Sequence, residues 1–296
     1  MKIRIGSRGS DLALWQANFV KDELTKEGHE VDIKIIVTRG DTIQHLSFDK
    51  IEGKGFFTKE IEESLLNNEI DLAVHSHKDL ETTSPEGLAI GAVSYRANPA
   101  DVLLIKPDAV SEVNVLDIKE DAVIGTSSAR RQTQLRRLRP DVQLKDLRGN
   151  VPTRVNKLRD GGYDGIVLAA AGLDRLELDL SDLKVVELIP TSFVPSPAQG
   201  VLGLQIREGD KDIEEALSIL HNAEIAKLIN IERSVLKEMD GGCQLPLGVY
   251  CVKSEGDYVV YTSYADSKGG VARVNSYKSN DAKGLIKRIV RDLKDE

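Results

Sequence analysis

Apolar positions in the first third of the chain repeat with two different periods, which predicts strands alternating with helices. The predicted strands cover residues 2–5, 31–37 and 70–75, and the predicted helices cover residues 12–24 and 58–67. Ser10 is a candidate N-cap of the first helix, and Gly28 ends that helix. Between residues 39 and 57 the periodicity fails, which is typical of a lid or a binding loop. The alternation indicates a parallel or mixed sheet with helices on both faces.

The middle of the chain repeats this opening. Its clearest unit is a strand over 122–125, a hydroxyl-bearing turn, and a helix over 129–139 that Pro140 closes. The elements expected after it are strands over 142–144 and 165–169 and a helix over 151–159. Ile5-Gly6-Ser7 and Ile124-Gly125-Thr126 both run from a strand into a hydroxyl-bearing turn before a helix. This repeat predicts two similar α/β domains that face a cleft.

The last third has a different pattern, with two helices, three alternating strands and a final amphipathic helix. These elements are expected over 212–220 and 224–239, over 247–253, 257–265 and 271–277, and over 281–293. Pro190, Pro195 and Pro197 mark a crossover before this part. We therefore expect three domains, which comprise residues 1–96 with 191–211, residues 97–190, and a small α+β domain over 212–296.

Composition narrows the class of protein. With 296 residues, 41% hydrophobic and 30% charged, the chain is long enough for two or three packed domains and is not a disordered protein. Its longest nearly apolar run, residues 165–173, is far shorter than the roughly 20 residues of a membrane span. Charged residues are spread through the first thirty positions, so we expect no secretory signal, no membrane partner and a cytoplasmic protein.

The net charge of −8 is unevenly distributed. Residues 126–159 hold ten basic and two acidic side chains, a local charge of +8, and the rest of the chain carries −16. Such a protein repels polyanions in general and attracts small anions at one place. With only 4% aromatic residues and no helix-turn-helix or RNA-binding signature, a nucleic-acid partner is not expected.

The basic residues cluster at predicted helix starts. Thr126 and Ser128 stand in a turn before a helix whose first turn carries Arg130 and Arg131, and helix starts bind anions through free backbone N–H groups. The alternative is an arginine-rich helix whose charges point at solvent. Three further arginines lie in loops or helices after the next strands, and one follows the first strand of the chain: Arg148, Arg154 and Arg175, and Arg8. Because ligands bind at the carboxyl ends of strands in open α/β sheets, these cations indicate a ligand with many carboxylates or phosphates.

Two more positions have the chemistry of a reaction site. Asp79 follows a strand, where it either pairs with a cation or stabilises positive charge that develops on a substrate. His75 and His77 are expected on one strand face in a structural role, and no spacing typical of a metal site is present. Cys243 follows two glycines, which permit unusual backbone angles and the approach of a bulky group, whereas Cys251 lies in a strand and looks structural.

Eight segments, taken together in order and spacing, resemble the porphobilinogen deaminase (hydroxymethylbilane synthase) family. They are R-x-S at 8–10 with LALWQA at 12–17, TRGD at 38–41, GKGFF at 53–57, AVHSHKD at 73–79, GTSSARR at 125–131, LRGNV at 147–151, AQG at 198–200 and GGCQ at 241–244. The resemblance extends over almost the whole chain. It implies an α/β fold with two similar doubly wound domains, of the periplasmic-binding-protein type, around a cleft, plus a small α+β C-terminal domain.

The same resemblance implies a monomeric cytoplasmic transferase that joins four porphobilinogen molecules head to tail on a covalent dipyrromethane primer, without a metal. Cys243 would carry the primer through a thioether, and Asp79 would be the catalytic residue. The residues that would hold the primer are Lys78, Asp79, Thr126, Ser128, Arg130 and Arg131. The residues that would hold the incoming substrate and the growing chain are Arg8, Ser10, Gln16, Lys54, Arg148, Arg154 and Arg175, with Lys54 on the predicted lid.

The main alternative is a two-lobed binding protein for a small polycarboxylate. It would also need two α/β lobes and an arginine-lined cleft. Such a protein would have no use for Cys243 after two glycines, and an exported one would carry a signal peptide.

Overall fold

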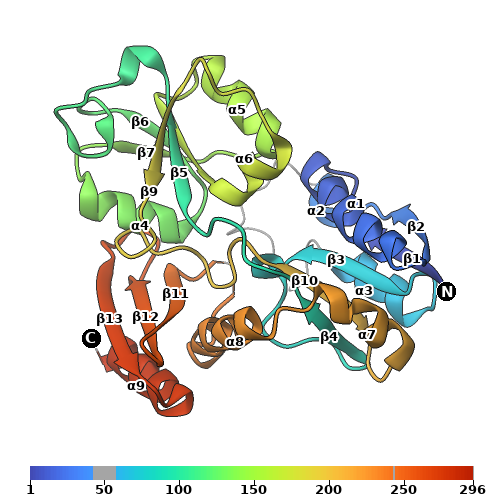
Figure 1. The fold of residues 1–296 in the computed structure, drawn as a ribbon. Helices are drawn as coiled ribbons and strands as arrows, with labels where there is room; N and C mark the ends of the chain where they lie inside the picture. Colours follow the sequence, from blue (N-terminus) through green and yellow to red (C-terminus); the bar gives the residue numbers. More distant parts are fainter. Residues whose placement is uncertain (43–57, 243, 296) are drawn as a thin grey trace. The chain divides into compact units, whose positions relative to one another are not determined.

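The structure, a computed structural model, describes residues 1–42, 58–242 and 244–295. The chain divides into two compact units (Figure 1). The first unit comprises Met1–Ala97 and Gly200–Lys227, and the second comprises Asn98–Gln199 and Leu228–Glu296. The three predicted domain boundaries are not tested by this division and stay a prediction.

The first unit contains a five-stranded sheet in the order β2-β1-β3-β10-β4. Its strands are β1 (Lys2–Ser7), β2 (Glu30–Ile35), β3 (Leu72–Ser76), β4 (Leu88–Val93) and β10 (Leu202–Arg207). Its helices are α1 (Asp11–Lys26), α2 (Arg39–Thr42), α3 (Lys59–Leu66) and α7 (Lys211–Leu217), with the short 3₁₀ helices η2 (His77–Asp79) and η5 (Ser218–Leu220). Strands β2, β1 and β3 are parallel, and β10 runs antiparallel to both β3 and β4. The carboxyl ends of β1 and β3 therefore lie at one edge of the sheet.

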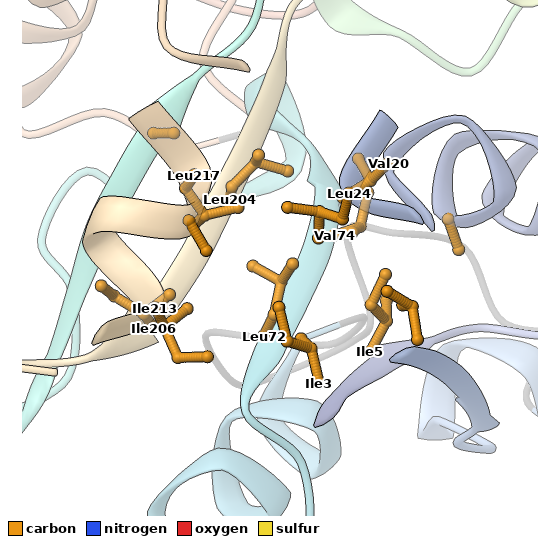
Figure 2. Packing of buried hydrophobic residues seen from close by; sticks show 14 of the residues in the cluster. Ile3, Ile5, Val20, Leu24, Leu72, Val74, Leu204, Ile206, Ile213 and Leu217 are labelled. Atoms are coloured by element: carbon orange, nitrogen blue, oxygen red, sulfur yellow. The ribbon is translucent and has the colours of Figure 1, made fainter. Parts of the chain in front are cut away.

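Alternation along the strands builds a core on each face of this sheet. Figure 2 shows Leu72 and Val74 of β3 directed toward the cluster that also holds Leu24 of α1 and Leu217 of α7. Ala73, between them in sequence, belongs instead to the cluster around α3. Successive side chains of a strand point to opposite faces, so β3 is buried on both sides and its backbone is rigidly placed.

The second unit contains a five-stranded sheet in the order β7-β6-β8-β5-β9. Its strands are β5 (Asp101–Ile105), β6 (Val123–Gly125), β7 (Gln143–Lys145), β8 (Gly165–Ala169) and β9 (Lys184–Leu188). Its helices are α4 (Ala129–Leu138), α5 (Val151–Arg159) and α6 (Ala170–Leu176), with η3 (Pro107–Ala109) and η4 (Val115–Asp117). Helices α4 and α5 cover opposite faces, because Leu135 packs with Leu103 and Val155 packs with Leu104.

The two sheets share one plan, as the internal repeat predicts. In both, the first three strands in spatial order are parallel and the fourth is antiparallel to its two neighbours. Gly6 in β1 and Gly125 in β6 occupy the same second strand, and a Cβ atom at either would collide with a side chain, Ile70 and Tyr163 respectively. The repeated glycine is thus a packing requirement in each sheet.

A three-stranded antiparallel sheet completes the second unit. It is formed by β11 (Leu247–Ser254), β12 (Asp257–Tyr264) and β13 (Arg273–Ser279), and it packs with α9 (Ala282–Asp295) and with α8 (Ala223–Glu238), most of which belongs to this unit. Cys251 and Val249 are fully buried in its core, so the structural role predicted for Cys251 is confirmed. The predicted fold class, two similar α/β sheets and a small α+β part, is confirmed as well.

The sequence pattern gave no separate prediction for β10, although this strand is buried along most of its length. It follows the predicted crossover and returns to the middle of the first sheet. Among the described residues, no helix combines the length and the apolar composition that are needed to cross a membrane.

Candidate active site

The carboxyl edge of the first sheet carries the candidate catalytic acid. Strand β3 ends at Ser76 and continues directly into η2, which places Asp79 in an exposed position and Lys78 in a half-buried one. Gln16 of α1 is buried, and its Nε2 donates a hydrogen bond to Ser76 Oγ at 2.8 Å. This bond ties α1 to the start of the turn that bears Asp79.

Arg8 and Ser10 lie at the same edge, because β1 and β3 are parallel neighbours and both residues follow β1. Ser10 stands at the N-cap position of α1, as predicted, but its side chain makes no capping hydrogen bond. Arg8 and Ser10 are both half-buried. The hydroxyl of Ser10 is therefore not committed to the helix that it precedes.

Beneath this edge lies a buried polar chain. His75 Nε2 contacts Gln205 Oε1 at 3.1 Å, and Gln205 Nε2 donates to Glu62 Oε1 at 3.0 Å. Burial lowers the pKa of His75 to about 4, and the nearby charge of Arg8 adds to the effect, so the ring is neutral at pH 7. The predicted structural role of His75 is confirmed.

The sequence pattern predicted that His75 and His77 share a strand face, and this prediction is wrong. His77 lies beyond the end of β3, in η2. Its backbone N–H donates to the carbonyl of Val201. In the described part of the chain, no group of three or more His, Cys, Asp or Glu side chains is arranged to hold a metal ion.

The second sheet buries charge at its carboxyl edge. Arg130 and Arg131, in the first turn of α4, have side chains that are 6% and 8% exposed, and both bind Asp101, which is fully buried. Arg130 Nη1 donates to Asp101 Oδ2 at 2.7 Å, and Arg131 Nη2 donates to Asp101 Oδ1 at 2.6 Å. The alternative of a solvent-facing arginine helix is therefore wrong for these two residues.

Hydroxyls shape the turn before α4. Ser128 is the N-cap, and its Oγ accepts a hydrogen bond from the backbone N–H of Arg131 at 3.5 Å. Thr126 is buried, its Oγ1 accepts from the N–H of Ser128 at 3.3 Å, and its carbonyl accepts from Gln132 Nε2 at 2.7 Å. These bonds fix the loop from which the two arginines project.

The three other predicted arginines lie near the same edge of the second sheet. Arg148 is half-buried in the loop before α5, where Gly149 has a left-handed φ of 119°. Arg154 of α5 is half-buried, and its Nε donates to the carbonyl of Gly149 at 2.6 Å. Arg175 lies in α6, the helix that directly follows β8, and it is buried.

Other arginines of the basic segment bind backbone carbonyls and acids of the second unit. Arg139 is buried and donates to the carbonyls of Val115, Ile118 and Lys119 as well as to Asp141. Arg136 Nη1 donates to the carbonyl of Lys268 at 2.6 Å, and Arg159 pairs with Asp182. The charge pattern of the sequence does not reveal these contacts. Every partner of the three arginines except Asp141 lies at least 20 residues away along the chain.

Sequence reasoning missed two residues at this edge, Asp101 and Gln199. Gln199 is buried, and its Nε2 donates to Asp101 Oδ1 at 3.0 Å and to the carbonyl of Pro99 at 2.8 Å. Gln199 does belong to a segment that carries the family resemblance, but the sequence held no sign of its partner.

Lys54 and Cys243 lie outside the described residues. Before Cys243, the left-handed conformation belongs to Asp240, with φ of 52°, and not to Gly241 or Gly242. Gly241 is needed for space instead, because a Cβ there would crowd Leu236 and Leu245.

Comparisons with known proteins show the family to which the sequence is similar. Residues 3–215 match the family model described as porphobilinogen deaminase, dipyromethane cofactor binding domain, and residues 226–288 match its C-terminal domain. A porphobilinogen deaminase of Maridesulfovibrio salexigens is 43% identical over 95% of this chain and 90% of that protein. One from Bacillus thuringiensis is 42% identical over 91% of this chain and 86% of that protein.

Among solved structures, the periplasmic VFT2 domain of BvgS from Bordetella pertussis aligns with a TM-score of 0.45 and 12% identity, over 78% of this chain and 93% of that chain. The family models and the two relatives cover both units, including the edges that carry Asp79 and the buried arginine pair. The chain belongs to the porphobilinogen deaminase family.

Proposed function

We propose that this protein is a porphobilinogen deaminase, which joins four porphobilinogen molecules head to tail, with loss of ammonia, into hydroxymethylbilane. The observation that carries the proposal is the family match over 95% of the chain, with Asp79 exposed at the carboxyl end of β3. The alternative function, a binding protein for a small polycarboxylate, is not needed to explain the arginines. Each porphobilinogen has two carboxylates, so a growing chain of them has many.

Asp79 is the catalytic residue in this proposal. It is exposed in a turn that directly follows a strand buried on both faces, so its carboxylate is presented from a rigid support. A carboxylate so placed accepts hydrogen bonds from pyrrole N–H groups. It also stabilises the positive charge that appears on the substrate when ammonia leaves.

The cofactor is a dipyrromethane primer held through a thioether at Cys243. When bound, it supplies the pyrrole carbon to which the first substrate is joined. The donors around α4 fit its acetate and propionate groups, because a capped helix start and two guanidinium groups meet at one sheet edge. We assign Lys78, Thr126, Ser128, Arg130 and Arg131 to these carboxylates, and Asp79 to the pyrrole N–H groups of the primer.

The remaining predicted residues are assigned to the substrate and the growing chain. Arg8 and Ser10 follow β1 at the edge that carries Asp79, and the hydroxyl of Ser10 is not used in capping. The other residues of this group are Gln16, Lys54, Arg148, Arg154 and Arg175. Gln16 already donates to Ser76, so we assign it to orienting the Asp79 turn as well as to binding.

We further propose that the enzyme is a monomer that works in the cytoplasm. A thiol reserved for a thioether is best kept reduced before it reacts, which a cytoplasmic location favours. Light scattering on the purified protein tests the first part, because a dimer would double the measured mass.

The test of the proposed function is the mass of the purified protein. The wild type should exceed its sequence mass by two linked pyrrole units, with the addition on the peptide that contains Cys243. Cys243→Ser should lack the addition and lose turnover of porphobilinogen. Cys251→Ser is the matched control and should stay modified and active. An unmodified wild type that still produces hydroxymethylbilane would refute the cofactor assignment.

A further inference from the structure

We propose that Asp101, held by Gln199, is a positioning residue that fixes the guanidinium groups of Arg130 and Arg131 in the orientation that receives a carboxylate of the primer. This inference rests on the proposed function, because it concerns the binding of dipyrromethane. Asp101 itself does not touch the ligand in this proposal and acts only through the two arginines.

The position of Asp101 follows from the sheet. It is the first residue of β5, and it pairs with Ala169, the last residue of the antiparallel strand β8. Because β6 and β8 are parallel, their carboxyl ends lie at the same edge of the sheet. Helix α4 follows the carboxyl end of β6, so it begins at the edge where Asp101 lies. Figure 1 shows β5 and α4 meeting in the second unit. An acid at this place therefore lies under the first turn of α4.

The charges at this place explain why an acid is needed. Arg130 and Arg131 are adjacent in sequence and both buried, so without a counter-charge two like charges would be desolvated side by side. Burial by itself would raise the pKa of Asp101, but the two guanidinium groups outweigh it and hold that pKa well below its usual range. Asp101 is thus ionised at neutral pH, and the three side chains together carry one net positive charge.

The hydrogen bonds show which donors remain for a ligand. Arg131 is held at three atoms, since Nε and Nη2 both donate to Asp101 Oδ1 and Nη1 donates to the carbonyl of Val167. Arg130 donates through Nη1 alone, to Asp101 Oδ2 and to the carbonyl of Val194. With the described residues, its Nε and Nη2 make no hydrogen bond. Asp101 therefore fixes one edge of Arg130 and leaves the other edge for a carboxylate.

Gln199 connects this cluster to the part of the chain that carries the anchor cysteine. It lies in a turn whose neighbour Ala198 has a left-handed φ of 63°. The N–H of Ala198 donates to Glu232 Oε2 at 2.7 Å, and the N–H of Cys251 donates to Glu232 Oε1 at 2.8 Å. Glu232 lies in α8 and Cys251 in β11, the two elements between which residue 243 lies in sequence. One network thus connects α8 and β11, the elements on either side of Cys243 in sequence, to Arg130 and Arg131.

Fold stability alone gives a weak reason for this cluster, because buried ion pairs are often replaced by apolar residues without loss of stability. A positioning role explains both the charge and the orientation. It also makes a distinctive prediction, since the share of folded protein that acquires the primer should depend on Asp101 more than on other buried ion pairs.

The test compares Asp101→Asn with Asp141→Asn, which removes the partner of the buried Arg139 in the same unit. Each variant is purified as folded monodisperse protein, and the fraction that carries the primer is read from its intact mass. Asp101→Asn should lower the primed fraction at least about tenfold, in line with the loss of a charge-assisted hydrogen bond. Asp101→Glu, which restores the charge, should recover part of it, and Asp141→Asn should be primed like the wild type.

A second variant guards against a failure of Asp101→Asn to fold. Gln199→Leu keeps every charge of the cluster and removes the donor to Asp101, so it should lower the primed fraction about threefold to tenfold. A primed fraction equal to or above that of the wild type in Asp101→Asn overturns the proposal. If that variant does not fold, the same result in Gln199→Leu overturns it. A wild type without primer and without turnover would instead refute the proposed function itself.

Discussion

The two α/β sheets end in carboxyl edges of the same topology and opposite character. At the first edge, Asp79 is exposed in a turn after β3, and below it the buried His75 is neutral. At the second edge, Asp101 is fully buried and pairs with two cations. One edge leaves its acid exposed, and the other buries its acid between two guanidinium groups. In our proposal the first acid takes part in the chemistry and the second positions binding groups. The two sheets thus repeat the topology but not the burial and charge of their edges.

The helix starts differ in the same way. Ser10 caps α1 only through its backbone, whereas Ser128 caps α4 with its hydroxyl. The strands that are fourth in the spatial order of each sheet, β10 and β5, differ too. Strand β10 contributes the amide of Gln205, which contacts His75, and β5 contributes the carboxylate of Asp101, which binds Arg130. In our proposal, the first edge binds a substrate that comes and goes, and the second edge is preorganised for a primer that stays bound.

The sharpest test of this comparison is the removal of the charge of Asp79. Asp79→Asn should lower turnover by about 10²–10³-fold or more, because one preorganised electrostatic group is lost where charge develops. The melting temperature should stay close to that of the wild type, since the side chain is exposed. Glu86→Gln, another exposed acid of the first unit, is the control and should keep full activity. A variant that retains more than half of the wild-type turnover would remove Asp79 from the mechanism.

The second test separates primer binding from chain growth. Arg131→Leu should accumulate protein without primer, at roughly a tenfold lower primed fraction, because the buried cation pair that is proposed to receive a carboxylate of the primer loses one charge. Arg175→Leu should instead be primed and should stall with a partly grown chain. Native mass spectra after incubation with porphobilinogen show the species directly. Arg159→Leu, which breaks an exposed pair with Asp182, should give the wild-type spectrum. The same ladder of species for the Arg131 and Arg175 variants would contradict the division.

The third test uses pH to distinguish the two buried networks. The pKa of His75 is lowered to about 4, so the unfolded chain binds more protons than the folded one as pH falls below 6.5. Between pH 7 and pH 5 the first unit should lose about 2 kcal/mol of stability. Asp101 stays ionised over this range, because its pKa is held well below the usual value, and the second unit should lose much less.

Hydrogen exchange read by mass spectrometry measures this difference. After correction for the intrinsic rate, peptides that cover β3 and β10 should lose protection at pH 5, and peptides that cover β5 and β8 should keep it. His75→Gln should flatten the pH dependence in the first unit. An equal loss in both units at pH 5 would show that His75 does not control the response.

The smallest effect concerns the two capping serines. Ser128→Ala should lower the free energy of unfolding by about 0.5–1 kcal/mol, because the bond from Arg131 N–H is lost. Ser10→Ala should change it by less than about 0.5 kcal/mol, since no side-chain cap exists there, but it should raise KM for porphobilinogen. Urea denaturation and steady-state kinetics measure the two effects. A larger loss of stability for Ser10→Ala than for Ser128→Ala would reverse the comparison.

Local patterns in the sequence were sufficient for most elements of this fold. The helix α5 and the strand β8 have the predicted bounds, because their apolar periods and their end signals agree. The repeat around Gly6 and Gly125 was also readable, since a close packing contact leaves a glycine in the same place of each sheet. Strand β10 was not predicted, although Leu202, Leu204 and Ile206 alternate with more polar positions. Its place between β3 and β4 depends on a long return of the chain, which only the tertiary structure shows.

By itself, the sequence determined the family, the α/β class, the basic segment and the candidate residues, because all of these are carried by the order and spacing of residue types. Only the tertiary structure decided which charges meet. Asp101 lies 29 residues from Arg130 and 98 from Gln199 along the chain, and the three converge because β5 returns antiparallel beside β8 at the edge where α4 begins. The same folding commits Arg136 and Arg139 to backbone carbonyls. A count of charges cannot make that distinction, since pairing in a buried place depends on which strands become neighbours.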